Sequence, residues 1–133
     1  MFLKNNNDNL VKIAALLIHA AKIDQDYSSQ EEQIIEQTMI EIGVKKENIK
    51  TLMKNAEDIE NNSNQILSFT KEVKKMGDEN KIKIVMSLWK IIYSNKVADI
   101  YESNLMRRLA GLLYIDNKLM GDIKEKIKNE NLK

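Results

Sequence analysis

The absence of proline is the sequence feature that most constrains the fold. Proline inside a helix removes a backbone N–H donor and clashes with the preceding turn, and none of the 133 residues is proline. Glycine, the next strongest helix breaker, occurs only four times. Aromatic residues, which favour strands, make up 5% of the chain. The composition therefore permits long helices and favours an all-α fold.

Hydrophobic periodicity predicts a compact bundle of about seven helices. Apolar residues at positions 10, 13, 14, 17, 18 and 21 share one face of a helix that runs from Leu10 to about Lys22. The same spacing predicts further helices at about 30–42, 47–56, 65–75, 79–94 and 100–114, and one that begins near 117. The helix at 79–94 is the most apolar and is expected to be the central, most buried one. The polar run 57–64 is expected to form a loop.

The chain is predicted to form a single domain. Its length suits one hydrophobic core, and no proline- or glycine-rich linker divides it. The polar, asparagine-rich segment 1–9 is expected to be a disordered or frayed leader. Residues 10–128 are expected to form the helical domain, and 129–133 a charged tail.

The composition excludes several kinds of functional site. Without cysteine the chain cannot form disulfides, thiolate nucleophiles, iron–sulfur clusters or cysteine zinc sites. Because the chain has only one histidine, a histidine-rich metal site within one chain is excluded. This residue, His19, lies near the end of a predicted helix, where a structural role is expected. No Gly-x-Ser-x-Gly motif is present. The chain is therefore predicted not to be an enzyme.

Charge and hydropathy limit the partners. The chain has 21 basic and 20 acidic residues, and a net charge of +1 provides no overall attraction to nucleic acid or anionic membranes. The apolar stretch at 13–18 falls short of the ~20 residues that a membrane-spanning helix needs. No signal peptide is evident. The protein is predicted to be cytoplasmic, with no nucleic-acid partner and no membrane span.

Both ends of the second predicted helix carry capping signals. Ser29 followed by Glu32 fits a capping box, and Ser28 with Glu31 fits it in an alternative register. Gly43 lies where a glycine in the left-handed conformation commonly ends a helix.

A faint internal repeat relates the first two helices to the fifth and sixth, with an offset of 71 residues. Apolar positions coincide: Leu17 with Leu88, Ile42 with Leu113 and Val44 with Ile115. Polar positions in the two inter-helix loops also coincide: Asp24 with Asn95, Ser28 with Asp99 and Glu31 with Glu102. The repeat predicts that the second and sixth helices occupy equivalent places.

At these loops the chain resembles the TerB-like family, named for bacterial tellurite resistance. The two helical hairpins of that family have turns that read approximately Ala-Asp-Gly-x-x-Asp-x-x-Glu. Here residues 23–31 read Ile-Asp-Gln-Asp-Tyr-Ser-Ser-Gln-Glu, and residues 94–102 read Ser-Asn-Lys-Val-Ala-Asp-Ile-Tyr-Glu. The segment 105–113, with adjacent Arg107 and Arg108, is similar to the family's apolar helix with its paired arginines. The resemblance covers roughly residues 10–127 and implies a TerB-like helical bundle.

The sequence departs from the family pattern at several loop positions. Gln25 and Lys96 replace both loop glycines, and Ser28 and Asn95 replace two of the aspartates. These changes remove negative charge from the place where the family is suspected to bind a cation.

The resemblance implies a non-catalytic module that binds a protein partner in stress response or tellurite resistance. We expect an exposed apolar patch on the partner-binding surface, with Tyr27 and Tyr101 at its edge. Adjacent arginines on a helix point about 100° apart, so one of Arg107 and Arg108 at most can face a given partner. An ion pair with a neighbouring helix is the simpler expectation for them. Homo-oligomerisation stays open.

The alternative is a divalent-cation-binding protein, with an ion such as calcium as its cofactor. Hard cations need several oxygen ligands, and the two loops offer six residues that carry them: Asp24, Ser28, Glu31, Asn95, Asp99 and Glu102. The same side chains can instead cap helices, because their oxygens accept hydrogen bonds from the first N–H groups of a helix. The sequence leaves both interpretations open.

Overall fold

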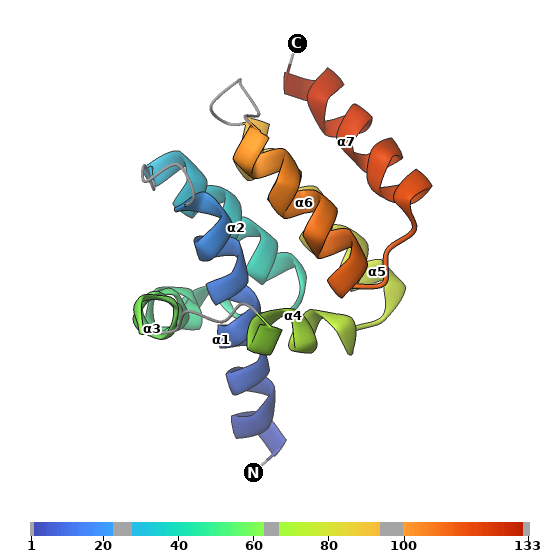
Figure 1. Cartoon of the computed structure of the whole chain (residues 1–133). Helices are drawn as coiled ribbons and strands as arrows, with labels where there is room; N and C mark the ends of the chain where they lie inside the picture. Colours follow the sequence, from blue (N-terminus) through green and yellow to red (C-terminus); the bar gives the residue numbers. More distant parts are fainter. Residues whose placement is uncertain (1, 23–27, 63–66, 94–99, 132–133) are drawn as a thin grey trace.

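The structure is a computed structural model that describes residues 2–22, 28–62, 67–93 and 100–131, with side chains described for 10–22, 28–62, 68–93 and 104–130 (Figure 1). These residues form seven α-helices and one short 3-10 turn, η1, and no strand. The helices are α1 (Phe2–Ala21), α2 (Ser29–Glu41), α3 (Ile49–Asn61), α4 (Leu67–Lys74), α5 (Asp78–Tyr93), α6 (Ile100–Leu112) and α7 (Asn117–Asn131), and η1 is Lys46–Asn48. The predicted all-α bundle is confirmed.

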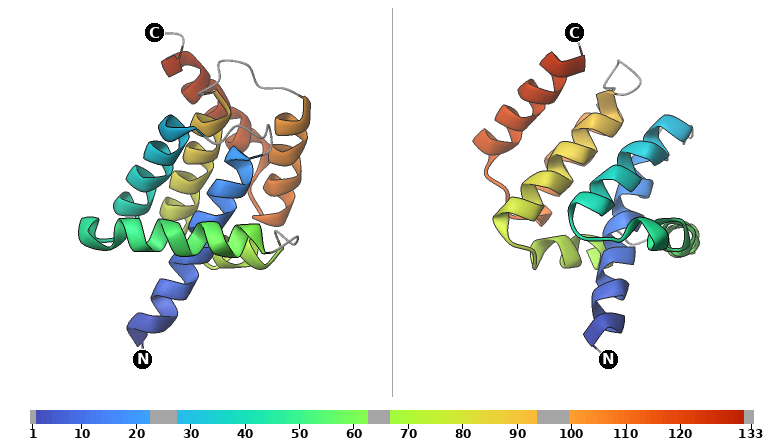
Figure 2. Two further views of the ribbon diagram at one scale, coloured as in Figure 1. Left: turned by 90° about the vertical axis from the view of Figure 1, so that its left-hand side faces the viewer. Right: turned by 180° about the vertical axis from the view of Figure 1, so that it is seen from behind.

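Helix α1 lies at the centre of the bundle. It packs against α2, α3, α4 and α5, and α3 crosses it at a steep angle (Figure 2). Residues 13–18 are each exposed by 2% or less, so every side of this stretch of the helix is covered. The expectation that the helix at 79–94 is the central one is therefore wrong. Ala14 and Ala15 explain the difference, because small side chains add little to apolar mass but allow neighbouring helices to approach closely.

The single hydrophobic core draws side chains from all seven helices. Polar groups inside it are paired where α2 meets α5: the hydroxyls of Thr38 and Ser87 lie 2.8 Å apart, and Thr38 also donates to the Ile34 carbonyl oxygen at 2.8 Å. This pair fixes the register of the two helices, because an unpaired buried hydroxyl would lower stability. Among the described residues, no helix is both long and apolar enough to cross a membrane.

Two helix boundaries differ from the expected ones. Helix α3 continues to Asn61, into the segment 57–64 that was expected to be a loop, because Ile59 extends the apolar stripe beyond Ala56. Helix α1 begins at Phe2, although 1–9 was expected to be a frayed leader, and this part projects from the bundle (Figure 2). A buried helix extends at little cost for each added residue once it has formed.

Helix α7 extends into the segment that was expected to be a charged tail. Residues 129–131 of the expected charged tail belong to the last turn of α7. Helices α2, α5 and α6 begin and end within one or two residues of the predicted positions.

The capping box at the start of α2 uses the alternative register. The Ser28 hydroxyl accepts a hydrogen bond from the Glu31 backbone N–H at 3.2 Å, and the Glu31 carboxylate accepts one from the Ser28 N–H at 2.8 Å. Ser29 is the first helical residue, so the pairing of Ser29 with Glu32 was wrong. Two backbone donors that lack a partner inside the helix are satisfied in this way.

The predicted repeat is visible where α2 and α6 end. The Val44 N–H donates to the Met39 carbonyl at 2.9 Å, and the Ile115 N–H donates to the Ala110 carbonyl at 2.9 Å. These two bonds are related by the same offset of 71 residues and are typical of the Schellman motif. The residue in the left-handed position is Gly43 in one case, with φ 126°, and Tyr114 in the other, with φ 58°.

Replacing Gly43 by alanine should destabilise the fold. A φ of 126° is open to glycine and strained for other residues, whereas an added Cβ would meet no atom within 4 Å. We expect Gly43→Ala to lower the free energy of unfolding by about 1–3 kcal/mol in urea denaturation. The control is Gly111→Ala in α6, also free of contacts, which should raise it by about 0.5–1 kcal/mol. Equal effects of the two substitutions would contradict this account.

Candidate functional site

The structure accounts for part of the predicted loop site. Ser28 and Glu31 lie together at the start of α2. Glu102 and Tyr101 belong to the first turn of α6, where the structure describes the backbone alone. The remaining residues lie outside the described part of the chain: Asp24, Tyr27, Asn95 and Asp99.

Helix capping is confirmed for the two residues whose side chains are described. Glu31 is 1% exposed, and its carboxylate and the Ser28 hydroxyl form the reciprocal bonds of the capping box. Within the described residues, no three histidine, aspartate or glutamate side chains gather closely enough to hold a metal ion. Cation binding by the six loop residues stays a prediction, because half of the set is outside the described part.

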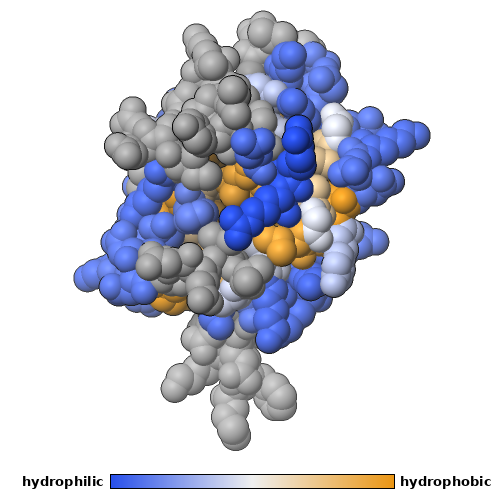
Figure 3. Space-filling model, viewed as in Figure 1, coloured by the Kyte–Doolittle hydropathy of each residue, from blue (hydrophilic) through white to orange (hydrophobic). Residues whose placement is uncertain are grey.

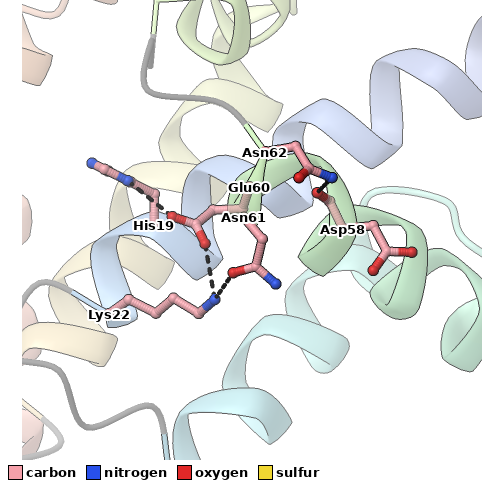
Figure 4. Close-up of polar contacts among 6 residues, drawn as sticks. All are labelled: His19, Lys22, Asp58, Glu60, Asn61 and Asn62. Carbon is pink, nitrogen blue, oxygen red and sulfur yellow. Dashed lines mark hydrogen bonds and ion pairs between the residues drawn. The ribbon is translucent and has the colours of Figure 1, made fainter.

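A polar cluster near the end of α1 explains His19. Glu60 of α3 lies between His19 of α1 and Lys22, the residue directly after α1: its Oε2 is 3.3 Å from His19 Nδ1, and its Oε1 accepts a hydrogen bond from Lys22 Nζ at 2.9 Å (Figure 4). Lys22 also donates to the Asn61 side-chain oxygen at 2.7 Å. The cluster fastens the ends of two crossing helices, so His19 has the structural role that its position predicts.

A groove with both apolar and polar lining residues lies between α6 and α7. Its floor is formed by Trp89, Met106, Ala110 and Met120, and it has a volume of about 210 Å³. The Trp89 indole donates to the Met120 sulfur at 3.3 Å, which holds the ring in place. Figure 3 shows apolar surface between these two helices, next to strongly hydrophilic side chains.

The edges of this groove are cationic. Arg107 of α6 and Lys124 of α7 line it, and Lys124 Nζ lies 5.4 Å from the centre of the Trp89 ring. The ion pair expected for the arginines does not form with any residue whose side chain is described. Below the groove, Tyr93 stacks on Trp89, with ring centres 5.9 Å apart. Burial raises the pKa of Tyr93, and the Glu125 carboxylate adds to the increase.

Tyr114 lies in the turn that joins the two helices of the groove. It is 75% exposed, and its φ of 58° places it in the left-handed region. Lys74 of α4 lies over the ring, with Nζ 4.2 Å from its centre. No sequence motif singles out Tyr114, although the offset of 71 aligns it with Gly43 and so places a tyrosine at a position that favours glycine.

Comparison with known families tests the resemblance. Residues 10–125 match the family model described as Tellurite resistance protein TerB. The chain belongs to the TerB family. The match includes both predicted hairpins and most of α7. No curated protein and no solved structure matched this TerB chain.

Removing the Ser28 hydroxyl from this TerB protein tests capping against cation binding. We expect Ser28→Ala to lower the free energy of unfolding by about 1 kcal/mol in EDTA, because α2 loses its N-cap. Ser29→Ala is the matched control and should change it by less than about 0.5 kcal/mol. The loss at Ser28 should be the same in millimolar calcium. A loss that is clearly larger in calcium, together with a calcium-dependent rise in the wild-type melting temperature, would instead support a cation site.

Truncating Glu60 should weaken the contact between α1 and α3. Its side chain is 11% exposed and interacts with His19 of α1 and with Lys22, the residue directly after α1, so Glu60→Ala leaves Lys22 and His19 without this acceptor. We expect a loss of about 1–2 kcal/mol in the free energy of unfolding. Asp58→Ala on the same helix is the control, because the Asp58 side chain is exposed and points away from the cluster (Figure 4). A similar loss in both variants would argue against the cluster.

Proposed function

We propose that this TerB-family protein is a non-catalytic module that binds a protein partner through Tyr114 and the groove between α6 and α7. The observation that carries the proposal is Tyr114, a large aromatic side chain that is 75% exposed on a left-handed backbone. Strained, exposed residues of this kind are concentrated at functional sites.

The energetics of Tyr114 support a role outside the monomer. The left-handed conformation costs an L-residue roughly 1–2 kcal/mol, and glycine at the equivalent position, Gly43, avoids that cost in the first half of the repeat. The contact of Lys74 with the ring offsets part of it, because an exposed cation–π interaction contributes about 0.5–1 kcal/mol. The contacts of Tyr114 within the chain therefore do not fully offset its backbone strain. Contact of the exposed ring with a partner would add the stabilisation that the isolated chain lacks.

The groove next to Tyr114 has the composition of a partner-binding surface. Aromatic, methionine and arginine residues are enriched at the centres of protein interfaces, and the groove combines Trp89, Met106 and Arg107. The cationic edges at Arg107 and Lys124 favour a partner segment with apolar and acidic side chains. Membership of the TerB family, whose model is described as a tellurite resistance protein, supports a partner in tellurite resistance. A cytoplasmic location and a role in stress response are part of the same proposal.

Two substitutions of Tyr114 separate binding from stability. Tyr114→Gly removes both the ring and the backbone strain, so we expect the free energy of unfolding to rise by about 1 kcal/mol while partner binding is lost. Tyr114→Ala removes the ring and keeps the strain, so binding should be lost without that gain. Urea denaturation measures the stability of both variants. Unchanged partner binding in both would refute the proposed role of Tyr114.

Site-specific photo-crosslinking in the cell of origin identifies the partner. A p-benzoylphenylalanine residue in place of Tyr114 should give a discrete cross-linked band whose second component is found by mass spectrometry. The control carries the same residue in place of Lys54, which is exposed on α3, away from α6 and α7 (Figure 1). A band from position 114 that disappears with Arg107→Glu would support the proposed surface. No band beyond those of the control would count against it.

A further inference from the structure

A second and larger pocket lies where α1, α3 and α4 meet the connection between α2 and α3. Its volume is about 780 Å³, which is within the range of small-molecule sites. Apolar side chains from four parts of the chain form its walls: Leu10 and Ile13, Val44, Leu52 and Met76. It shares no lining residue with the groove between α6 and α7, so the two are separate cavities.

One carboxylate of this pocket is buried without a full set of hydrogen bonds. Glu72 of α4 lines the pocket and is 7% exposed. Its Oε2 forms no hydrogen bond with the described residues. Its Oε1 lies 3.7 Å from Nζ of Lys75, a long ion pair whose lysine side chain is 62% exposed. A buried acceptor without a donor is unfavourable, so a ligand that brings a donor to Glu72 would relieve this cost.

Either carboxylate oxygen of Glu72 can be presented to the pocket. The terminal torsion of a glutamate side chain is broad and roughly two-fold, so rotation of the carboxyl group exchanges Oε1 and Oε2 without moving the helix. A donor that enters the pocket therefore does not have to reach the covered oxygen directly.

The chemistry of the pocket selects the charge of the ligand. A negative group would be repelled by the Glu72 carboxylate, and a hard divalent ion would have this one carboxylate as its only anionic ligand in the pocket. A positively charged N–H donor gains both a hydrogen bond and an ion pair with Glu72. Two exposed lysines at the pocket, Lys45 and Lys75, disfavour a ligand with several positive charges.

We propose that this pocket binds a primary alkylammonium ion with a single positive charge. The ammonium group donates to the Glu72 carboxylate, and the aliphatic stem packs against Val44, Leu52 and Met76. Polar side chains that also line the pocket, Asn48 and Asn80, supply acceptors for the remaining ammonium hydrogens.

The test is a titration of the full chain with n-hexylammonium, followed by ¹H–¹⁵N NMR. We expect saturable shifts at pocket residues, with a dissociation constant on the order of 1 mM for so small a ligand. Hexan-1-ol, which is neutral, should bind at least about tenfold more weakly, because it cannot form the charge-assisted hydrogen bond. Hexanoate should not bind, because its carboxylate is repelled by that of Glu72. Equal binding of the amine and the alcohol would overturn the proposal.

Substitution of Glu72 assigns the binding to its carboxylate. Glu72→Gln keeps the shape of the side chain and removes its charge, so hexylammonium should bind at least about tenfold more weakly. Glu79→Gln is the matched control, because Glu79 is exposed on α5 and does not line the pocket. The affinity of this variant for hexylammonium should equal that of the wild type. Thr51→Phe, an exposed position at the pocket, should also block binding and serves as the second variant. Unchanged affinity in Glu72→Gln, or no saturable shift in the wild type, would overturn the proposal.

A final comparison distinguishes two sources of the same group. An alkylammonium can be a free amine or the lysine side chain of another protein. Lysine blocked as its N-acetyl, N′-methylamide derivative carries the same head and stem between two peptide bonds. Binding as tight as that of hexylammonium would assign the pocket to a lysine side chain. Binding of hexylammonium alone would assign it to a free amine.

Discussion

The burial of α1 on every side is the constraint on which the rest of the bundle depends. Its residues 13–18 have no solvent-facing side, so α2, α3, α4 and α5 must each cover part of them. Burial of one leucine or isoleucine side chain contributes about 1.5–3 kcal/mol. Loss of any covering helix would expose several such side chains together. The polar cluster of Glu60 and the capping box of Ser28 fix the ends of the helices that provide this cover.

Local signals were sufficient for the helices and insufficient for their packing. Periodicity predicted α2, α5 and α6, and a capping box located the start of α2, because the residues that carry these signals are neighbours in sequence. The end of α3 at Asn61 depends on Ile59 finding a place in the core, and the centrality of α1 depends on the neighbours of Ala14 and Ala15. Neither is encoded within one helical turn. At the start of α2 the sequence predicted a capping box in either of two registers, Ser28 with Glu31 or Ser29 with Glu32. The structure has the pair Ser28 and Glu31.

The internal repeat shows what alignment of a chain with itself can and cannot reveal. The offset of 71 residues predicted equivalent places for α2 and α6, and the structure shows that these two helices end with equivalent bonds, of Val44 to Met39 and of Ile115 to Ala110. It did not show that Tyr114 is strained, because strain depends on φ and a sequence contains no torsion angles. Once the backbone is known, the contrast with Gly43 becomes informative. The second half of the repeat keeps a side chain at a position where the first half has none.

Buried and strained groups divide into those that the chain satisfies by itself and those that it does not. Thr38 and Ser87 pair with each other inside the core, whereas Glu72 keeps an oxygen without a donor and Tyr114 keeps an exposed ring on a strained backbone. Glu72 and Tyr114 are both in contact with the C-terminal end of α4: Lys74 contacts Tyr114, and Lys75, the residue directly after the helix, makes a long ion pair with Glu72. Local exceptions to self-consistent packing are expected at functional sites. A ligand that binds Glu72 would change the position of Lys75, its ion-pair partner. Lys75 follows directly after Lys74, which contacts Tyr114. The two proposed sites are therefore connected through the backbone of this short segment.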